Sequence, residues 1–347
     1  MAQIGCVGII ANPASGRDIR RLVAGASVVG NADKAGIVLR VLAGLGAAGV
    51  RTALMMPAGD GLSAALERLL RSHARALQED GAAPLPSLEV LSMPLTGTAA
   101  DSVRAVELMR EAGAAVIVVL GGDGTHRVVA KACGDVPLCT LSTGTNNSFP
   151  EMREGTVAGL AAGLVASGQV GGEALRRESA LAVELPGAGR ELALVDVVAT
   201  DRPFVGARAL WRASDVSELF VAFAGPSSVG FSSVAGMLHP LPRGGGRALH
   251  VRLTADLRRA EIVLRVPLAP GLVTPVGVAG FRTLEMGETT ALAPAAGCLA
   301  LDGEREIERR PGEPTTVRLV PGPLTVDVDG VMRQAARAGA TRLPGPG

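Results

Sequence analysis

The stretch VVLGGDGTHR, residues 118–127, decides the fold and points to a site. The apolar run AAVIVVL, which ends at Leu120, is short and rich in β-branched residues, so it predicts a strand buried on both faces. The backbone then turns through Gly121 and Gly122, and Asp123 stands just before an expected helix, HRVVAKAC. Glycines let a backbone approach an anion closely, and the free N–H groups of a helix start favour negative charge. The stretch therefore predicts a phosphate-binding loop with one carboxylate inside it.

Apolar strands alternate with helical patterns on both sides of this stretch. The strand-like runs are CVGIIANP, RTALMMP, LEVLSMP, AAVIVVL and PLCTLS. This rhythm predicts a Rossmann-like α/β domain over residues 1–150, with a parallel sheet and helices on both faces. Loops 12–18, 121–125 and 143–147 each follow a strand, and the carboxyl ends of parallel strands lie at one edge of a sheet. We therefore expect these three loops to meet at one crevice.

The pattern changes after about residue 175. Short strand-like runs separated by Gly and Pro follow, and several alternate apolar and polar residues; ELALVDVVATD, residues 191–201, is one of them. This predicts an antiparallel β-sandwich domain over residues 151–328 that completes the acceptor site. Residues 329–347 are expected to form a C-terminal helix and tail.

Composition excludes several classes of function. The 347 residues include 34 Lys and Arg against 33 Asp and Glu, a net charge of +1, and aromatic residues make up only 2%. A basic field and base-stacking side chains are therefore both lacking, so we expect no nucleic-acid partner. The two lysines, Lys34 and Lys131, stand outside any Walker-type motif. The four cysteines form no CxxC pair, which favours buried reduced thiols over a zinc or disulfide framework.

The sequence also carries no targeting signal that we identify. The start, MAQIGCVGIIANP, lacks the basic region and long apolar core of a signal peptide. A membrane-spanning apolar segment of about 20 residues is also missing. We expect a cytoplasmic protein with no stable membrane insertion and a small-molecule substrate.

Four motifs together resemble the superfamily of NAD kinases, diacylglycerol kinases and sphingosine kinases. GGDGT at 121–125 is the shared signature, NPASG at 12–16 resembles the NPxSG of the lipid-kinase branch, and STGTNNSFP at 142–150 resembles its PxGTxNDFA loop. LDGE at 301–304 resembles a late motif that is DGE in bacterial lipid kinases. Four ordinary glycine turns in this order and spacing would be a rare coincidence.

The resemblance implies transfer of the γ-phosphoryl group of ATP to a hydroxyl, with Mg²⁺. It places ATP against Asn12, Ser15, Gly16, Gly121, Gly122, Gly124, Thr125, Gly144, Thr145 and Asn146. Asp123 has two candidate roles, as the base for the acceptor hydroxyl or as an indirect ligand of Mg²⁺. Asp302 and Glu304 could share those tasks, as in lipid kinases. Such chemistry depends mainly on positioning and charge neutralisation.

The acceptor implied by the NAD-kinase resemblance is NAD. ALVDVVATDR at 193–202 stands where NAD kinases carry a Leu-Asn-Glu segment that contacts NAD, with Val195 at the Asn position and Asp196 at the Glu position. AGPSSVGFSSVAG at 224–236 is similar to their TPTGSTAYSLSAGG, although its centre differs. The implied acceptor contacts are Asn147, Asp196, Ser227 and Ser233.

A narrower resemblance is to the ATP-NAD kinase-like proteins of the acetoin catabolism protein X type. The segments that carry it are GGDGTHRVVAK, LSTGTNN, ALVD and VGARALW. Two alternatives stay open beside NAD kinase. One is a lipid kinase of the diacylglycerol type, although membrane-recruiting features are weak here. The other is a nucleotide-binding regulator of acetoin metabolism without turnover. Homo-oligomers are common in the family, so we expect one.

Overall fold

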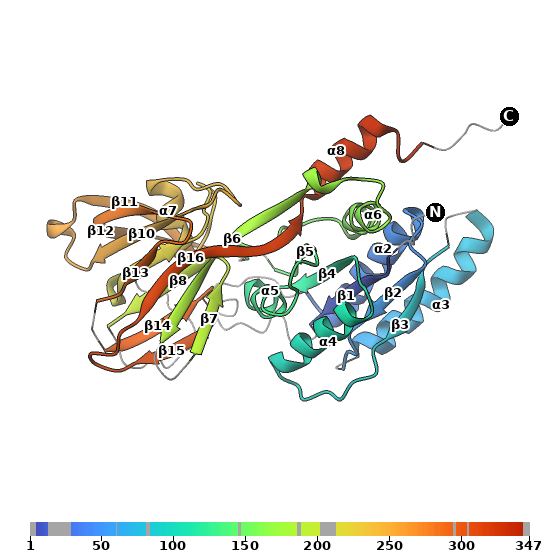
Figure 1. Ribbon diagram of the computed structural model, residues 1–347, viewed down its shortest axis with the longest axis horizontal. Coiled ribbons are helices and arrows are strands. Elements are labelled where there is room, and N and C mark those ends of the chain that lie inside the picture. Colours follow the sequence, from blue (N-terminus) through green and yellow to red (C-terminus); the bar gives the residue numbers. More distant parts are fainter. Residues whose placement is uncertain are drawn as a thin grey trace.

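A computed structural model describes most of the chain: residues 5–12, 29–59, 61–80, 84–144, 147–185, 189–201, 213–293, 296–303 and 305–342. Two bodies lie side by side in it, one built on parallel strands and one built of antiparallel strands (Figure 1). The predicted fold class, a Rossmann-like domain followed by an antiparallel β domain, is confirmed.

Parallel strands form the centre of the first domain, as the apolar runs predict. In spatial order they are β3 (Ser87–Val90), β2 (Thr52–Met55), β1 (Val7–Ala11), β4 (Val116–Gly121) and β5 (Leu138–Ser142). The same nine-stranded sheet continues through β16 (Thr316–Val326), β6 (Leu175–Leu185) and β7 (Gly189–Ala193), and β13 (Thr289–Ala291) pairs with β16. Strands β1, β4 and β5 are almost fully buried, which explains their continuous apolar sequences.

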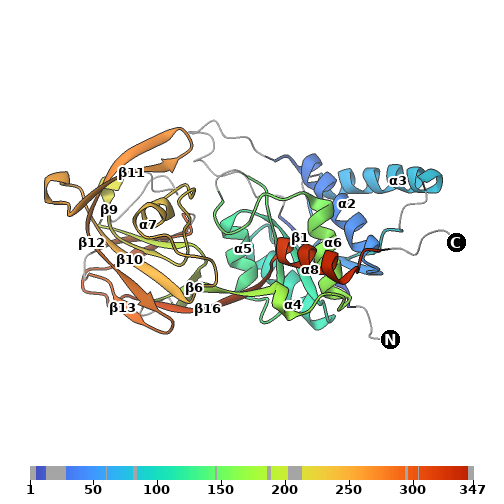
Figure 2. The same ribbon diagram turned by 90° about the horizontal axis from the view of Figure 1, so that it is seen from above.

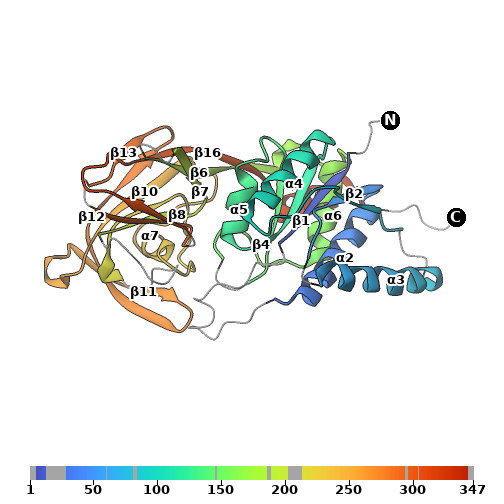
Figure 3. The ribbon, with the colours of Figure 1, turned by 90° about the horizontal axis from the view of Figure 1, so that it is seen from below.

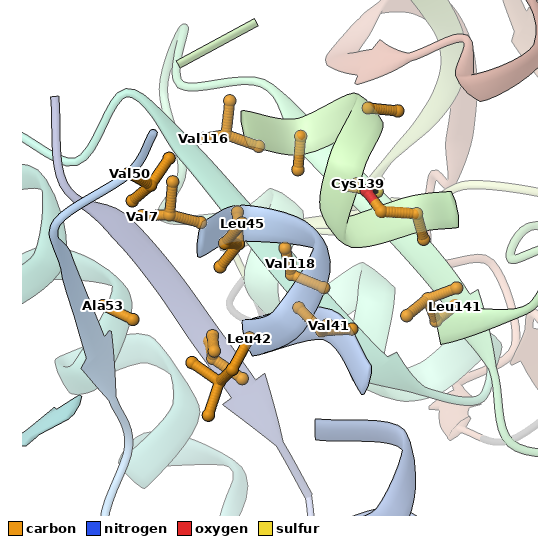
Figure 4. Packing of buried hydrophobic residues seen from close by; sticks show 14 of the residues in the cluster. Val7, Val41, Leu42, Leu45, Val50, Ala53, Val116, Val118, Cys139 and Leu141 are labelled. Atoms are coloured by element: carbon orange, nitrogen blue, oxygen red, sulfur yellow. Dashed lines mark hydrogen bonds between the residues drawn. The ribbon is translucent and has the colours of Figure 1, made fainter. Parts of the chain in front are cut away.

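Helices cover both faces of this sheet. They are α2 (Asn31–Ala47), α3 (Leu62–Asp80), α4 (Ala99–Glu111), α5 (Asp123–Ala130) and α6 (Gly155–Ala166). Alternate residues of each strand face opposite sides, so Val116 and Val118 pack with α2 and α6, whereas Ile117 and Val119 pack with α4. Figure 4 shows Val41, Leu42 and Leu45 of α2 over the strand residues of the first of these cores.

Helices α2 and α6 touch backbone to backbone through glycines. A Cβ added to Gly159 of α6 would lie 2.2 Å from the Val41 carbonyl oxygen, and one added to Gly44 of α2 would lie 2.3 Å from the Thr156 carbonyl oxygen. Atoms of real side chains do not approach so closely, so each glycine is required for the present helix separation. This contact places the start of α6, and the β5–α6 loop (residues 143–154) before it, against the core.

Antiparallel strands form the second sheet. In order they are β11 (Ile262–Ala269), β12 (Leu272–Glu285), β10 (Arg247–Thr254), β9 (Val216–Val221), β8 (Asp196–Thr200), β14 (Gly297–Leu301) and β15 (Arg305–Arg309). One face packs against β6, β7 and β16 to make a sandwich, and the other carries the helix α7 (Ser232–Leu238). Three short 3₁₀ helices complete the described elements, at Gly172–Ala174, Ala213–Asp215 and Leu257–Arg259.

Strands β6 and β16 belong to both domains. They pair over nearly their whole length, and Figure 1 shows them running from one body into the other. After β16 the chain ends in α8 (Val328–Ala338), which packs beside α6 on the first domain (Figure 2). The predicted boundaries at residues 150 and 328 stay predictions, while α6 and α8 both contribute to the first domain's core.

Two local expectations are wrong. Helix α5 begins at Asp123 and not at His126, so Asp123 lies in the first turn, where a carboxylate is favoured by the helix dipole. The run 191–201 is not one strand, because it breaks at Leu194 and Val195 between β7 and β8, which lie in different sheets. The N–H groups of Leu194 and Val195 donate to the Asp302 carboxylate instead. None of the helices in the described residues is long and apolar enough to cross a membrane.

Replacing Gly159 by Ala should destabilise the first domain. The new methyl group would collide with the α2 backbone, and overpacking of this kind typically costs about 1–3 kcal/mol. Gly36→Ala is the matched control, because its Cβ would meet nothing closer than 3.5 Å and alanine stabilises a helix interior by about 0.5–1 kcal/mol. Thermal unfolding should show a lower midpoint for Gly159→Ala and an unchanged or higher one for Gly36→Ala. Equal midpoints would contradict the proposed packing constraint.

Candidate functional site

Helix α5 and the glycines before it form the centre of the site. The helix starts at the carboxyl end of β4, on the side of the first domain that faces the second (Figures 1 and 3). A Cβ added to Gly121 would lie 2.5 Å from the Cβ of Thr125, so only glycine lets the strand end this close to the helix. The N-terminus of α5, with Gly122 as its N-cap residue, therefore stands where the sequence predicts that the three loops meet.

The Asp123 carboxylate holds the β5–α6 loop. Its Oδ1 accepts hydrogen bonds from the Phe149 N–H at 2.7 Å and the Ser148 N–H at 3.1 Å, and its Oδ2 accepts from the Ser148 N–H at 3.1 Å. Asp123 is only 8% exposed. The signature aspartate thus fixes a second loop of the crevice by charge-assisted hydrogen bonds.

The side chains of Ser142 and Asn147 also form hydrogen bonds that stabilise this loop. The Ser142 hydroxyl donates to the Gly144 carbonyl oxygen at 2.6 Å, and the Asn147 amide Nδ2 donates to Ser142 Oγ at 2.7 Å. Gly144 is buried. Asn147, predicted to contact the acceptor, has its amide bonded within the loop that Asp123 holds.

The third predicted loop is joined to α5 at Asn12. Its side-chain Nδ2 donates to Thr125 Oγ1 at 3.2 Å. Its carbonyl oxygen accepts a hydrogen bond from the Lys34 ammonium at 3.0 Å, and Lys34 is only 1% exposed. The loop ends of β1, β4 and β5 are therefore brought together as expected, with a buried cation beside them.

Arg127 joins α5 to the second domain. It is 5% exposed, and its guanidinium donates to the Leu301 carbonyl oxygen at the end of β14. The same Nη1 lies 3.9 Å from the Asp302 carboxylate. One arginine of the first domain thus reaches the LDG turn of the second.

Asp302 is a structural centre of that turn. Its carboxylate accepts hydrogen bonds from the N–H groups of Leu194, Val195 and Asp196, at 2.8–3.2 Å. Its backbone has φ +52°, the left-handed conformation that Asp tolerates better than most residues. Burial raises the pKa of Asp302, while Arg127 and the three N–H groups act in the opposite direction. These bonds explain why the predicted strand at 191–201 is broken.

His126 is buried in the first turn of α5 as a neutral imidazole. Its Nδ1 lies 2.8 Å from the Gly122 carbonyl oxygen, so Nδ1 carries the proton, and its ring lies 5.9 Å from the ring of Phe149. Burial lowers the pKa of His126 to about 4, against the opposing effect of the Gly122 carbonyl. The ring is therefore uncharged at neutral pH.

Arg243 enters the site from the second domain, between α7 and β10. Its Nη1 donates to the Phe149 carbonyl oxygen at 2.6 Å, and its guanidinium carbon lies 4.7 Å from the Phe149 ring centre and 4.8 Å from that of Phe223. Its Nη2 lies 3.0 Å from Oε1 of the buried Glu178. The sequence offers no sign of this contact, because LPRGGG resembles an ordinary surface turn.

The structure brings together the described members of the predicted site to different degrees. Eight of them lie at the adjoining ends of β1, β4 and β5 and in the first turn of α5: Asn12, Gly121, Gly122, Asp123, Gly124, Thr125, Gly144 and Asn147. Asp196 is bonded through its backbone to Asp302. Ser233 is buried in α7 and donates to the Gly230 carbonyl oxygen at 2.5 Å, while Ser227 is exposed before α7. Five predicted residues lie outside the described ranges: Ser15, Gly16, Thr145, Asn146 and Glu304.

The described carboxylates do not gather into a metal-binding cluster. Within the described ranges, no group of three or more His, Cys, Asp and Glu side chains could hold a metal ion. Both oxygens of Asp123 and of Asp302 accept backbone N–H groups. The described carboxylates therefore hold loops and make no preformed cage for the ion, which would also need oxygens of the nucleotide phosphates.

Sequence reasoning did not find the interdomain contacts of Arg127 and Arg243 or the burial of Lys34 beside Asn12. Lys34 carries a weak signal, since it is one of only two lysines and follows the Asn12 loop. Arg127 directly follows the signature, yet its partner Leu301 lies 174 residues away. Such pairings depend on how the two domains sit together.

Acid should destabilise the wild-type protein more than a His126→Asn variant. In the unfolded protein His126 has its ordinary pKa of 6.5, whereas in the folded protein its pKa is about 4. Between these two pH values the unfolded state therefore binds a proton that the folded state does not bind. The free energy of unfolding therefore rises with pH between 4 and 6.5, by about 3 kcal/mol from this group. Denaturant unfolding at pH 7 and pH 4.5 should show a smaller loss in His126→Asn. Identical losses would contradict burial of a neutral ring, and His73→Asn on α3 serves as the control.

Asp302→Asn should lower stability in the absence of any ligand. An amide has one oxygen to accept the three N–H groups, and its NH₂ would face donors, so we expect a loss on the order of 3 kcal/mol. Asp135→Asn removes only an exposed ion pair with Arg177 and should change stability by less than about 1 kcal/mol. Thermal unfolding of both variants checks this. An Asp302→Asn midpoint equal to that of the wild type would show that the three bonds add no stability.

Comparison with known proteins identifies the family of the chain. Residues 7–170 match the model of the ATP-NAD kinase N-terminal domain, and residues 179–322 match that of the Acetoin catabolism protein X C-terminal domain. The chain is 44% identical over 353 residues to Acetoin catabolism protein X of Cupriavidus necator (strain ATCC 17699 / DSM 428 / KCTC 22496 / NCIMB 10442 / H16 / Stanier 337), covering 99% of this chain and 97% of that protein. A solved structure of a proposed diacylglycerol kinase from Bacillus anthracis str. Sterne aligns with 94% of this chain and 98% of its own, at TM-score 0.44 and 11% identity. The chain therefore belongs to the acetoin catabolism protein X family of NAD kinase-like proteins.

Proposed function

We propose that the protein is an ATP-dependent phosphotransferase that phosphorylates a hydroxyl of NAD. The observation that carries this proposal is the junction of three strand ends at the N-terminus of α5, with Asp123 anchoring the β5–α6 loop. A helix N-terminus preceded by glycines favours phosphate oxygens. The match of residues 7–170 to an ATP-NAD kinase domain supports ATP as the donor.

Asp123 is the base that this proposal favours. Asp302 is a poor candidate, because its carboxylate is buried among three backbone N–H groups and holds the 194–196 turn. Asp123 also accepts N–H groups, but it lies in the first turn of α5, directly after the glycines that this proposal assigns to the phosphates. The acceptor hydroxyl would lose its proton to this carboxylate as the γ-phosphoryl group is transferred.

In this proposal, residues of the second domain bind the acceptor, NAD. Asp196 keeps a carboxylate where NAD kinases carry a glutamate, and Asp302 fixes its backbone within the interdomain region. A lipid acceptor has no comparable support in the described residues.

A regulator that binds nucleotide without turnover is the second candidate. One observation favours it: Asp123 and Asp302 both hold loops through backbone N–H groups, so their presence does not require chemistry. The name of the Cupriavidus necator relative refers to acetoin catabolism and to no reaction. The cytoplasmic location and the homo-oligomer expected from the sequence stay predictions.

NADP formation from ATP, Mg²⁺ and NAD tests the proposal, with Asp123→Asn beside the wild type. We expect product from the wild type and a fall in kcat of about 100-fold or more in the variant, the usual effect of losing a general base. ATP affinity, measured by calorimetry, should fall less than tenfold, because the amide that replaces the carboxylate still offers one oxygen to the loop. Asp135→Asn, an exposed change in the same domain, should keep full activity.

Three outcomes separate the alternatives. ATP binding without NADP formation by the wild type would overturn the NAD-kinase proposal and support the regulator. A parallel loss of ATP affinity and kcat in Asp123→Asn would show that the carboxylate acts through the loop. NADP formation that survives in the variant would assign the base to another group.

A further inference from the structure

The β5–α6 loop is held at Phe149 by groups from both domains. On the first-domain side, the Phe149 N–H donates to Asp123 at 2.7 Å. On the second-domain side, the Phe149 carbonyl oxygen accepts from Arg243 at 2.6 Å. The loop that follows β5 therefore has its backbone fixed from opposite sides.

Arg243 is well suited to this role because its own position is fixed. Its Nε and Nη2 lie 3.2 and 3.0 Å from Oε1 of Glu178, which is 1% exposed and lies on β6, the strand shared by the two domains. Its guanidinium also lies over the rings of Phe149 and Phe223. A planar guanidinium that is paired, stacked and hydrogen-bonded in this way is strongly oriented.

We propose that Arg243 is a positioning residue through which the second domain fixes the β5–α6 loop for nucleotide binding. The part of this inference that concerns nucleotide rests on the proposed function. Arg243 does not need to touch the nucleotide, since it acts through Phe149 on the loop that contains Gly144 and that Asp123 also holds. Nucleotide affinity is thereby coupled to the placement of the second domain.

Arg176 provides a matched control. Its Nε lies 2.9 Å from the same Glu178 Oε1, so Arg176→Met and Arg243→Met each remove one cation from one buried carboxylate. Thr325 Oγ1 also donates to this oxygen at 2.7 Å, so Glu178 keeps partners in either variant and the fold should survive. Of these two arginines, Arg243 is the one that reaches Phe149.

Hydrogen exchange of the full-length protein without nucleotide tests the positioning role directly. The peptide containing Ser148 and Phe149 should exchange at least tenfold faster in Arg243→Met than in the wild type, while peptides of β4 stay unchanged. Arg176→Met should match the wild type, and Arg243→Lys should lie between, since it keeps the charge and loses the planar contacts. Unchanged exchange in Arg243→Met, or equal acceleration in Arg176→Met, would overturn the inference.

ATP binding measured by calorimetry on the same four proteins tests the coupling. We expect the dissociation constant to rise at least tenfold in Arg243→Met and less than threefold in Arg176→Met. Equal affinities of wild type and Arg243→Met would overturn the coupling to nucleotide. A wild type that binds no ATP, together with the expected exchange pattern, would overturn the proposed function and support the positioning role.

Discussion

Backbone hydrogen bonding between β6 and β16 is the constraint on which the rest of this structure depends. The pairing runs from Thr316 opposite Glu184 to Val326 opposite Leu175, with a shift in register between Pro321 and Leu324. One end of this ribbon lies in the sandwich core and the other lies beside β5. Because both strands are continuous, they place the second domain next to α5. Arg127 and Arg243 can then each form a hydrogen bond to the other domain in a fixed position.

At two places in this fold, a buried carboxylate accepts backbone N–H groups where the chain leaves a strand. A loop that leaves a sheet has backbone N–H groups without strand partners, and burying such groups unbonded is costly. Asp123 satisfies two of them in the β5–α6 loop, and Asp302 satisfies three between β7 and β8. The acidic residues of a nucleotide-binding signature can therefore be needed for the loop geometry itself. Their presence alone does not distinguish an enzyme from a binding protein.

The sequence predicts the sheet better than the site. Short apolar runs rich in β-branched residues, such as AAVIVVL, are typical of buried strands, so the parallel sheet and its strand-end loops could be predicted. The start of α5 is misplaced because a glycine-rich stretch shows no helical periodicity, although Asp123 is typical of a first turn. The break at Leu194 and Val195 depends on Asp302, more than 100 residues later. Arg243 is beyond sequence reasoning for the same reason, since its partners come from three distant segments.

The return of the chain to its first domain has a consequence for synthesis. Val331 and Ala335 of α8 belong to the core that also contains β1, and β16 supplies the neighbour of β5. A nascent chain that has reached only α6 would carry β5 as an open sheet edge and leave part of this core exposed to water. Because translation delivers β16 and α8 after the sandwich strands, the first domain can reach its final packing only when these two segments have left the ribosome. Folding of the two domains is thus expected to be coupled, because β16 contributes to both cores.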